Sequence, residues 1–158
     1  MLPDAAKLAA SLPLAQAMRE HAWLYPAVET LHIVGFAVLV GAVAMFDLRV
    51  LGFGRQLPVK ALARHLLPWS AGSILLVLPT GLLLFVVDPA ALLANRVFLL
   101  KLALILLAGL NALAFHAGPY RQADAWAQRA PIRASLHALL SLGLWIAVIA
   151  CGRLLAYF

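Results

Sequence analysis

The stretch from Tyr25 to Gly52 reads YPAVETLHIVGFAVLVGAVAMFDLRVLG, and about twenty of its residues form a mostly apolar run, the length of a transmembrane helix. At roughly 1.5 Å per residue, a helix of that length crosses the hydrocarbon core of a bilayer. Glu29 and His32 lie within this run, three residues apart and so on one face of a helix. In lipid, each of these groups costs a few kcal/mol unless it faces protein, water or a ligand. The rest of the chain should therefore provide a protected interior for them.

The composition of the whole chain is typical of an integral membrane protein. Of its 158 residues, 65% are hydrophobic and only 11% are charged, whereas soluble domains contain about 25% charged and about 45–50% apolar residues. The formal net charge of +6 then reflects loops and orientation, so we expect no nucleic-acid partner. A single cysteine, Cys151, excludes an internal disulfide and any site built from several cysteines.

Four long apolar segments indicate an all-α membrane protein, an antiparallel bundle of four transmembrane helices in a single domain that occupies residues 1–158. The expected spans cover about residues 27–47, 62–87, 97–116 and 132–156. Pro79 should kink the second span, because proline removes a backbone donor. Residues 2–23 mix leucines with charged side chains, which predicts an amphipathic interfacial helix with Ser11 as its cap.

The distribution of lysine and arginine predicts an orientation. Seven of these residues follow the first and third spans, and five lie on the opposite side. Because cytoplasmic loops are enriched in positive charge, the two basic loops should face the cytoplasm. Both termini should then lie in the periplasm of a bacterial inner membrane, with the lipid bilayer as the main partner.

Histidines stand out among the few polar residues of the spans. His65, His116 and His137 are expected near the cytoplasmic boundary on three different helices, whereas His32 should lie roughly 8 Å inside the opposite face. Imidazoles on facing helices can ligate haem iron or a transition metal. His65 and His137, on diagonal helices, could flank one haem. His116 could replace either ligand or become the third ligand of a metal site.

Four further polar residues complete the candidate set. Lys101 and Arg153 could pair with haem propionates or with Glu29, and Asn111 is placed to hydrogen-bond between helices. Each feature also has a structural interpretation. The boundary histidines can face lipid headgroups, Lys101 and Arg153 can extend to the interface, and Glu29 with His32 can form a polar patch without a ligand.

The pattern ETLH…G…DLRxLG resembles a bacterial family of four-span membrane proteins known only as a domain of unknown function. The residues that carry it are Glu29, His32, Gly35, Asp47, Arg49 and Gly52. This resemblance covers nearly the whole chain. Fainter resemblances run to the copper resistance D family, through the third span, and to the membrane-bound, haem-containing protoporphyrinogen oxidase family. The latter resemblance implies His32 and Lys101 as functional residues.

The leading hypothesis is a membrane protein that binds haem b non-covalently through its histidines and acts in electron transfer or redox chemistry. Each haem would have two imidazole ligands, or one imidazole and an open position, and a second haem could lie near His32. A redox partner or quinone, and a second copy of the chain, are further candidate partners. One alternative is a non-enzymatic protein that binds a metal ion or small ligand through Glu29, His32 and Lys101. Another is a structural or accessory subunit. No motif of a soluble enzyme is present, so the sequence leaves open whether the protein is an enzyme.

Overall fold

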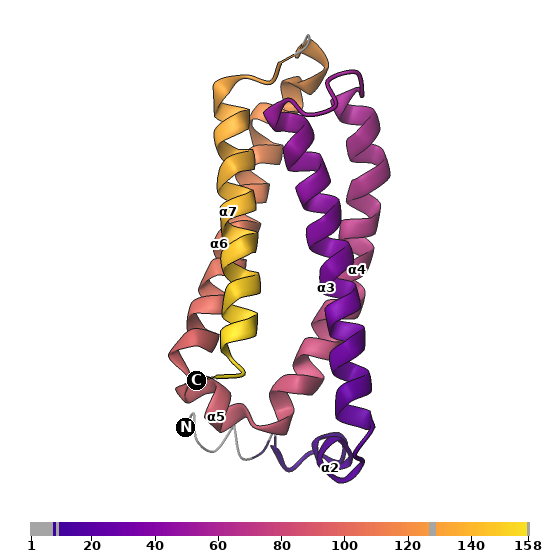
Figure 1. The fold of residues 1–158 in the computed structure, drawn as a ribbon, viewed down its shortest axis with the longest axis vertical. Helices are drawn as coiled ribbons and strands as arrows, with labels where there is room; N and C mark the ends of the chain where they lie inside the picture. The colour runs from indigo at the N-terminus through magenta and orange to yellow at the C-terminus, as the bar shows by residue number, and fades with distance from the viewer. Residues whose placement is uncertain (1–7, 9, 127–128, 158) are drawn as a thin grey trace.

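The computed structural model describes residue 8 and residues 10–126 and 129–157, and it shows long helices standing side by side (Figure 1). The long helices are α3 (Leu24–Leu51), α4 (Val59–Val87), α6 (Arg96–Ala117) and α7 (Ile132–Leu154). The short elements are α2 (Pro13–Glu20), α5 (Pro89–Ala94) and the 3-10 helix η1 (Pro119–Ala125). Residues 52–58 and η1 lie at one end of the bundle, the loop end, and α2 and α5 lie at the other, the α5 end.

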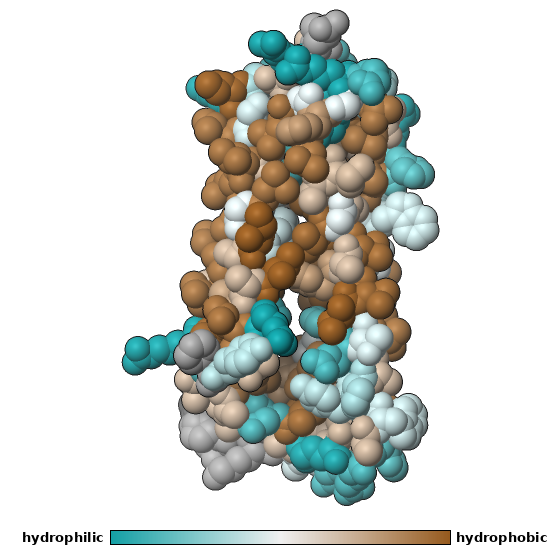
Figure 2. Space-filling view, viewed as in Figure 1, coloured by the Kyte–Doolittle hydropathy of each residue, from teal (hydrophilic) through white to brown (hydrophobic). Residues whose placement is uncertain are grey.

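Each of the four long helices is long and apolar enough to cross a membrane. The shortest has 22 residues, about 33 Å of helix, and the hydrocarbon core of a bilayer is about 30 Å thick. No more than 28% of the apolar stretch of any of them is buried inside the protein. Hydrophobic surface covers the middle of the molecule, and hydrophilic surface gathers toward its ends (Figure 2). The chain is therefore a multi-pass membrane protein, and the predicted all-α four-helix bundle is confirmed.

The bundle consists of two helical hairpins. α3 packs along α4, α6 packs along α7, and the two hairpins meet where α3 packs on α7. Among the described residues, α4 makes no close backbone contact with α6 or α7, and neither does α3 with α6. The hairpins therefore do not close on each other along their whole length. Figure 2 shows an opening between them in the half nearer to α5.

The loop end contains the apolar core of the protein. This cluster draws on all four long helices and η1, with Phe46, Val50, Val59, Ala63, Phe115, Ala123, Ala134 and Ala138 as its buried members. The Phe46 and Phe115 rings meet edge to face with centroids 5.7 Å apart, an arrangement that the ring quadrupoles favour. Aromatic rings packed against alanines allow the helices to converge at this end.

Arg49 fixes the connection between α3 and α4. Its side chain is buried, and its guanidinium donates from Nε to the Leu57 carbonyl (2.6 Å) and from Nη2 to the Arg55 carbonyl (3.0 Å). Gly52 ends α3 with a φ of 108°, a left-handed conformation that favours glycine. The arginine and the final glycine of the DLRxLG pattern therefore shape the turn between two spans.

The amphipathic N-terminal segment is described in part. Residues 2–7 and 9 of the predicted segment lie outside the described residues, whereas α2 forms within it as expected. Ser11 does not act as the predicted cap, because Leu12 occupies the N-cap position of α2. The Ser11 hydroxyl donates instead to the carbonyl of Leu8 (2.8 Å).

α4 continues through Pro68 and Pro79 as one helix. In Figure 1 its ribbon bends toward α5 in the half that contains Pro79, in agreement with the predicted kink. The carbonyl of Val87, in its last turn, has no partner within the helix and accepts a hydrogen bond from Arg19 Nη1 of α2 (2.9 Å). Arg19 thus fastens α2 to the end of α4.

Gly35 sets the close approach of α3 and α4. A Cβ at this position would lie 3.0 Å from Val77 Cγ2 and 3.2 Å from Leu76 Cδ2. Small residues at such points let helix backbones pack closely in membranes. Gly41 lies on the same helix, and a Cβ there would meet no atom within 4 Å.

We predict that Gly35→Leu destabilises the protein by about 1–3 kcal/mol, because the new side chain must displace Val77 and Leu76. The matched control, Gly41→Leu, should change stability by less than about 1 kcal/mol. Both values come from SDS-induced unfolding in mixed micelles. Equal effects of the two substitutions would contradict the packing described for Gly35.

Candidate functional site

His32 and Thr80 form a hydrogen-bonded pair between α3 and α4. His32 Nδ1 lies 3.0 Å from Thr80 Oγ1, and the same hydroxyl lies 2.6 Å from the carbonyl of Leu76 on its own helix. Because the hydroxyl proton is given to that carbonyl, Thr80 Oγ1 accepts a hydrogen bond from His32 Nδ1–H. The imidazole is therefore the Nδ1–H tautomer, and the lone pair of its Nε2 is left free.

Gly81 provides the space in which this imidazole lies. A Cβ at Gly81 would be 3.1 Å from His32 Cε1 and 3.6 Å from its Nδ1, so the ring stands against the backbone of α4. His32 Nε2 is not among the atoms within 4 Å of that position. The ring therefore presents Nε2 on an edge that is turned away from Gly81.

Lys101 of α6 adds a positive charge to this half of the bundle. Its side chain is half-buried, and its Nζ would lie 3.7 Å from a Cβ at Gly152 of α7. Lys101 forms no ion pair with any of the described residues. The ion pair observed among them joins Lys60 and Asp124. Lys101 and Glu29 both lie close enough to the His32 ring to act on it electrostatically. The three charged or titratable groups named in the alternative hypothesis are thus near one another.

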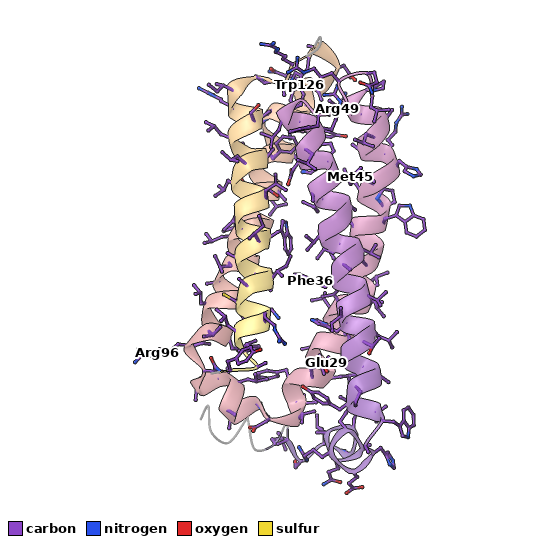
Figure 3. The ribbon with its side chains drawn as sticks, in the orientation of Figure 1. Glu29, Phe36, Met45, Arg49, Arg96 and Trp126 are labelled. Atoms are coloured by element: carbon purple, nitrogen blue, oxygen red, sulfur yellow. The ribbon has the colours of Figure 1, made fainter. Side chains whose placement is uncertain are left out.

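Two aromatic pairs border the opening between the hairpins. Phe36 of α3 and Trp145 of α7 meet edge to face with centroids 5.8 Å apart. Phe85 of α4 and Phe98 of α6 stack with centroids 6.0 Å apart, next to α5. Figure 3 shows Phe36 and Glu29 on the side of α3 that faces the other hairpin. The opening therefore combines aromatic surface with an imidazole, an ammonium and a carboxylate.

Arg96 and Arg153 both lie toward the α5 end of the bundle, but their side chains are arranged differently. Arg153 is exposed, and its Nη2 donates to the Tyr157 hydroxyl (2.7 Å), with its guanidinium carbon 5.1 Å from the Tyr157 ring centroid. It directly follows Gly152, which lies beside Lys101. Arg96 points away from the bundle (Figure 3). Of the two, Arg153 is the one placed near the opening.

A second polar pair joins α6 and α7 toward the loop end. His137 Nδ1 lies 2.7 Å from Asn111 Oδ1, and Asn111 Nδ2 donates to the backbone carbonyl of His137 (3.0 Å). Asn111 therefore makes the expected hydrogen bonds between helices. The orientation of its amide also fixes His137 as the Nδ1–H tautomer.

The structure does not gather His65, His116 and His137 into one site. His65 is exposed on α4, while His116 Nδ1 bonds to the Ala112 carbonyl of its own helix (2.8 Å) and its ring faces Tyr120. In the part of the chain that the structure describes, no group of three His, Cys, Asp or Glu residues could hold a metal ion. The predicted ring of imidazoles is absent there because equal depth does not make side chains face one another.

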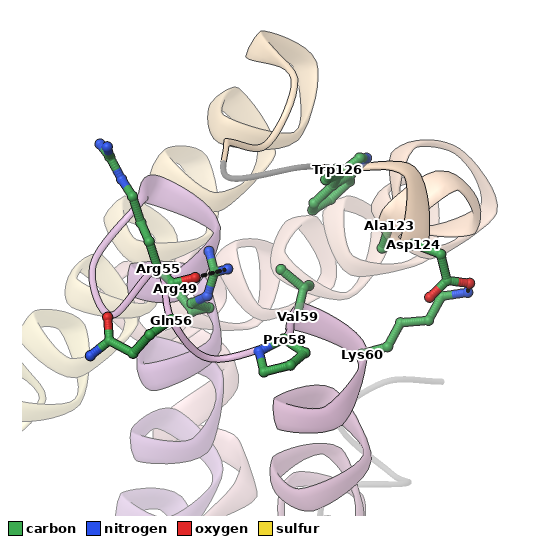
Figure 4. Close-up of a pocket in the computed structure, with 9 residues that line it drawn as sticks. All are labelled: Arg49, Arg55, Gln56, Pro58, Val59, Lys60, Ala123, Asp124 and Trp126. Atoms are coloured by element: carbon green, nitrogen blue, oxygen red, sulfur yellow. Dashed lines mark hydrogen bonds and ion pairs between the residues drawn. The ribbon is translucent and has the colours of Figure 1, made fainter.

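A depression of about 280 Å³ lies at the loop end (Figure 4). Lys60 and Asp124 form an ion pair within it, and the Arg49 guanidinium is bonded to loop carbonyls. These charged groups already have partners inside the protein. The depression therefore lies between the two loops, and its Lys60, Asp124 and Arg49 side chains are engaged within the protein.

We predict that Asn111 and His137 contribute a coupling energy of about 0.5–2 kcal/mol, because each bonds the other within the bilayer. A double-mutant cycle of Asn111→Ala and His137→Ala, read by unfolding in mixed micelles, gives this value. The control cycle pairs Asn111→Ala with His65→Ala and should be additive within about 0.5 kcal/mol. Additivity in the first cycle would contradict the pair.

Comparison with known proteins gives one match. No curated protein and no solved structure matches the chain. The family model that matches the chain is neither that of the copper resistance D family nor that of the protoporphyrinogen oxidase family, so those two resemblances stay predictions. Residues 19–158 match the family described as "Family of unknown function (DUF6644)", and the chain belongs to this family.

Proposed function

We propose that the protein is a membrane haem protein that holds one haem b between its hairpins, with His32 as an axial ligand. The observation that carries the proposal is the hydrogen bond from His32 Nδ1–H to Thr80, which leaves Nε2 free. Imidazoles that bind metals are held in this way, with the second nitrogen donating to a fixed acceptor. The backbone of α4 at Gly81, against which the ring lies, orients it further.

The side chains around the opening fit a flat, apolar macrocycle with two carboxylates. The Phe36–Trp145 and Phe85–Phe98 pairs provide aromatic surface. Lys101 has no ion-pair partner among the described residues and is placed to meet a propionate. When bound there, haem would supply one-electron redox chemistry.

This proposal moves the haem away from the predicted pair of His65 and His137. His65 is exposed, and α4 and α7 make no close backbone contact in the described segments. His32 would be the single imidazole that holds the haem, which is one of the ligation states expected from the sequence. Glu29 lies one turn from the ligand and can balance positive charge at the metal.

The role that we propose is electron transfer within a bacterial inner membrane. A buried haem exchanges electrons with a neighbouring carrier, so a quinone or a membrane redox protein is the proposed partner class. The excess of arginine and lysine at the loop end supports a cytoplasmic location for that end.

A second candidate function is the binding of a small anionic ligand without haem. The position of Lys101 favours it, because a half-buried ammonium that forms no ion pair among the described residues can bind a carboxylate or phosphate. His32 would then act as a hydrogen-bonding group. The absence of haem from protein made in haem-replete cells would favour this function.

We predict a sharp α band in the reduced-minus-oxidised spectrum of the purified protein, and one haem per chain by the pyridine haemochrome assay. His32→Ala should remove the haem while the protein still elutes as a folded species in size-exclusion chromatography. The matched control is His65→Ala, which should retain full haem content because His65 is exposed. Loss of haem in the control and not in His32→Ala would contradict the ligand assignment.

We also predict that Thr80→Val lowers haem affinity by about tenfold, since it removes the acceptor that fixes the His32 ring. Valine has nearly the same shape as threonine, so helix packing should be preserved. Haem titration of the apoprotein measures the effect, and Thr30→Val is the control. The Thr30 hydroxyl bonds to the Pro26 carbonyl of its own helix and does not contact His32 through a hydrogen bond. Unchanged affinity in Thr80→Val would show that this hydrogen bond does not support the ligand.

A further inference from the structure

Asp47 occupies a different environment from the one that the sequence suggests. It was expected to mark the exit of the first span, but α3 continues to Leu51 and Asp47 is only 6% exposed. Its Oδ2 is fully buried and has no hydrogen-bond partner among the described residues. Its neighbour Phe46 belongs to the apolar core. Asp47 is thus a carboxyl group enclosed in the best-packed part of the bundle.

No described cation compensates this carboxyl group. The titratable and charged side chains near this end are Arg49 on α3, Arg55 in the turn that follows, Lys60, Arg64 and His65 on α4, His116 on α6, Tyr120, Arg121 and Asp124 on η1, Arg129 before α7, and Arg133 and His137 on α7. Arg55, Arg121 and Arg129 are exposed, and His116 bonds to the Ala112 carbonyl of its own helix. Arg49 bonds to loop carbonyls, Lys60 pairs with Asp124, and His137 bonds to Asn111. Arg64, His65 and Arg133 are exposed, and the Tyr120 ring packs against Phe46.

An unpaired carboxylate in such a place is far more costly than a neutral acid. The penalty for an uncompensated buried charge is several kcal/mol, whereas a buried polar group without a partner costs about 1–3 kcal/mol. The Ser141 hydroxyl of α7 lies near Asp47 and is the one polar side chain among the described residues placed to donate to its carboxyl group, and one such hydrogen bond does not offset the cost of burying a charge. We infer that Asp47 is a proton-binding site, in which the carboxylate takes up one proton from the aqueous phase at the loop end.

The position of this site gives the proton a structural effect. Asp47 lies on α3 and Ser141 on α7, and the contact of these two helices joins the hairpins. A bound proton leaves the α3–α7 contact neutral. Release of the proton would place a negative charge between the hairpins and weaken their association. This inference does not depend on haem.

The proton can be detected by infrared spectroscopy of the full-length protein in lipid. The chain has only six Asp and Glu residues, so the C=O stretching band of a protonated carboxyl group can be assigned. We expect this band at neutral pH in the wild type. It should be absent in Asp47→Asn and retained in Asp124→Asn, a control that removes an exposed carboxylate. Ser141→Ala should shift the frequency of the band and leave its intensity.

A wild-type spectrum without the band at neutral pH would overturn the inference, and so would a band that persists in Asp47→Asn. Asparagine has the shape of the neutral acid, so the variant should fold, as circular dichroism would show. Unfolding in mixed micelles gives an independent readout. Raising the pH should destabilise the wild type more than Asp47→Asn, because only the wild type would then carry a charge at the α3–α7 contact.

Discussion

A polar side chain within a bilayer must find its partner inside the protein, because the hydrocarbon core offers no water. Two pairs of polar groups in the spans of this protein meet that requirement across two helices. His32 bonds to Thr80 between α3 and α4, and Asn111 bonds to His137 between α6 and α7. These bonds lie within each hairpin, so each hairpin is held together by polar as well as apolar contacts. Asp47 lacks such a partner among the described residues, and His32 has one at only one of its two ring nitrogens.

The two ends of the bundle differ in how closely the helices pack. At the loop end, aromatic rings and alanines pack all four long helices together. At the α5 end, the hairpins separate, and the space between them is bordered by polar side chains and two aromatic pairs. One end can therefore stabilise the fold while the other end accommodates a ligand.

Hydrophobic length alone was enough to predict the four spans, because lipid imposes that length on any helix that crosses it. His32 was also recognisable, since it is a titratable residue in an apolar run. The hydrogen bond from His32 to Thr80 could not be predicted. Thr80 lies 48 residues away in the sequence, and the pairing depends on the rotation of each helix about its axis. The same rotation separates His65 from the other histidines. The first span was predicted to end at Asp47 because charged residues usually end spans, but here the helix continues to Leu51.

The backbones of α4 and α6 stay apart in the described residues, although Phe85 stacks on Phe98 next to α5, and this incomplete closure has a consequence for how a ligand would arrive. The opening between the hairpins is flanked by helices whose outer surfaces face lipid. A molecule that partitions into the membrane can approach it sideways, without crossing a headgroup layer at that moment. The membrane would then act as a reservoir, in which an apolar ligand is concentrated before it meets the protein. Occupancy of the site would depend on the amount of ligand per lipid and only indirectly on its concentration in water.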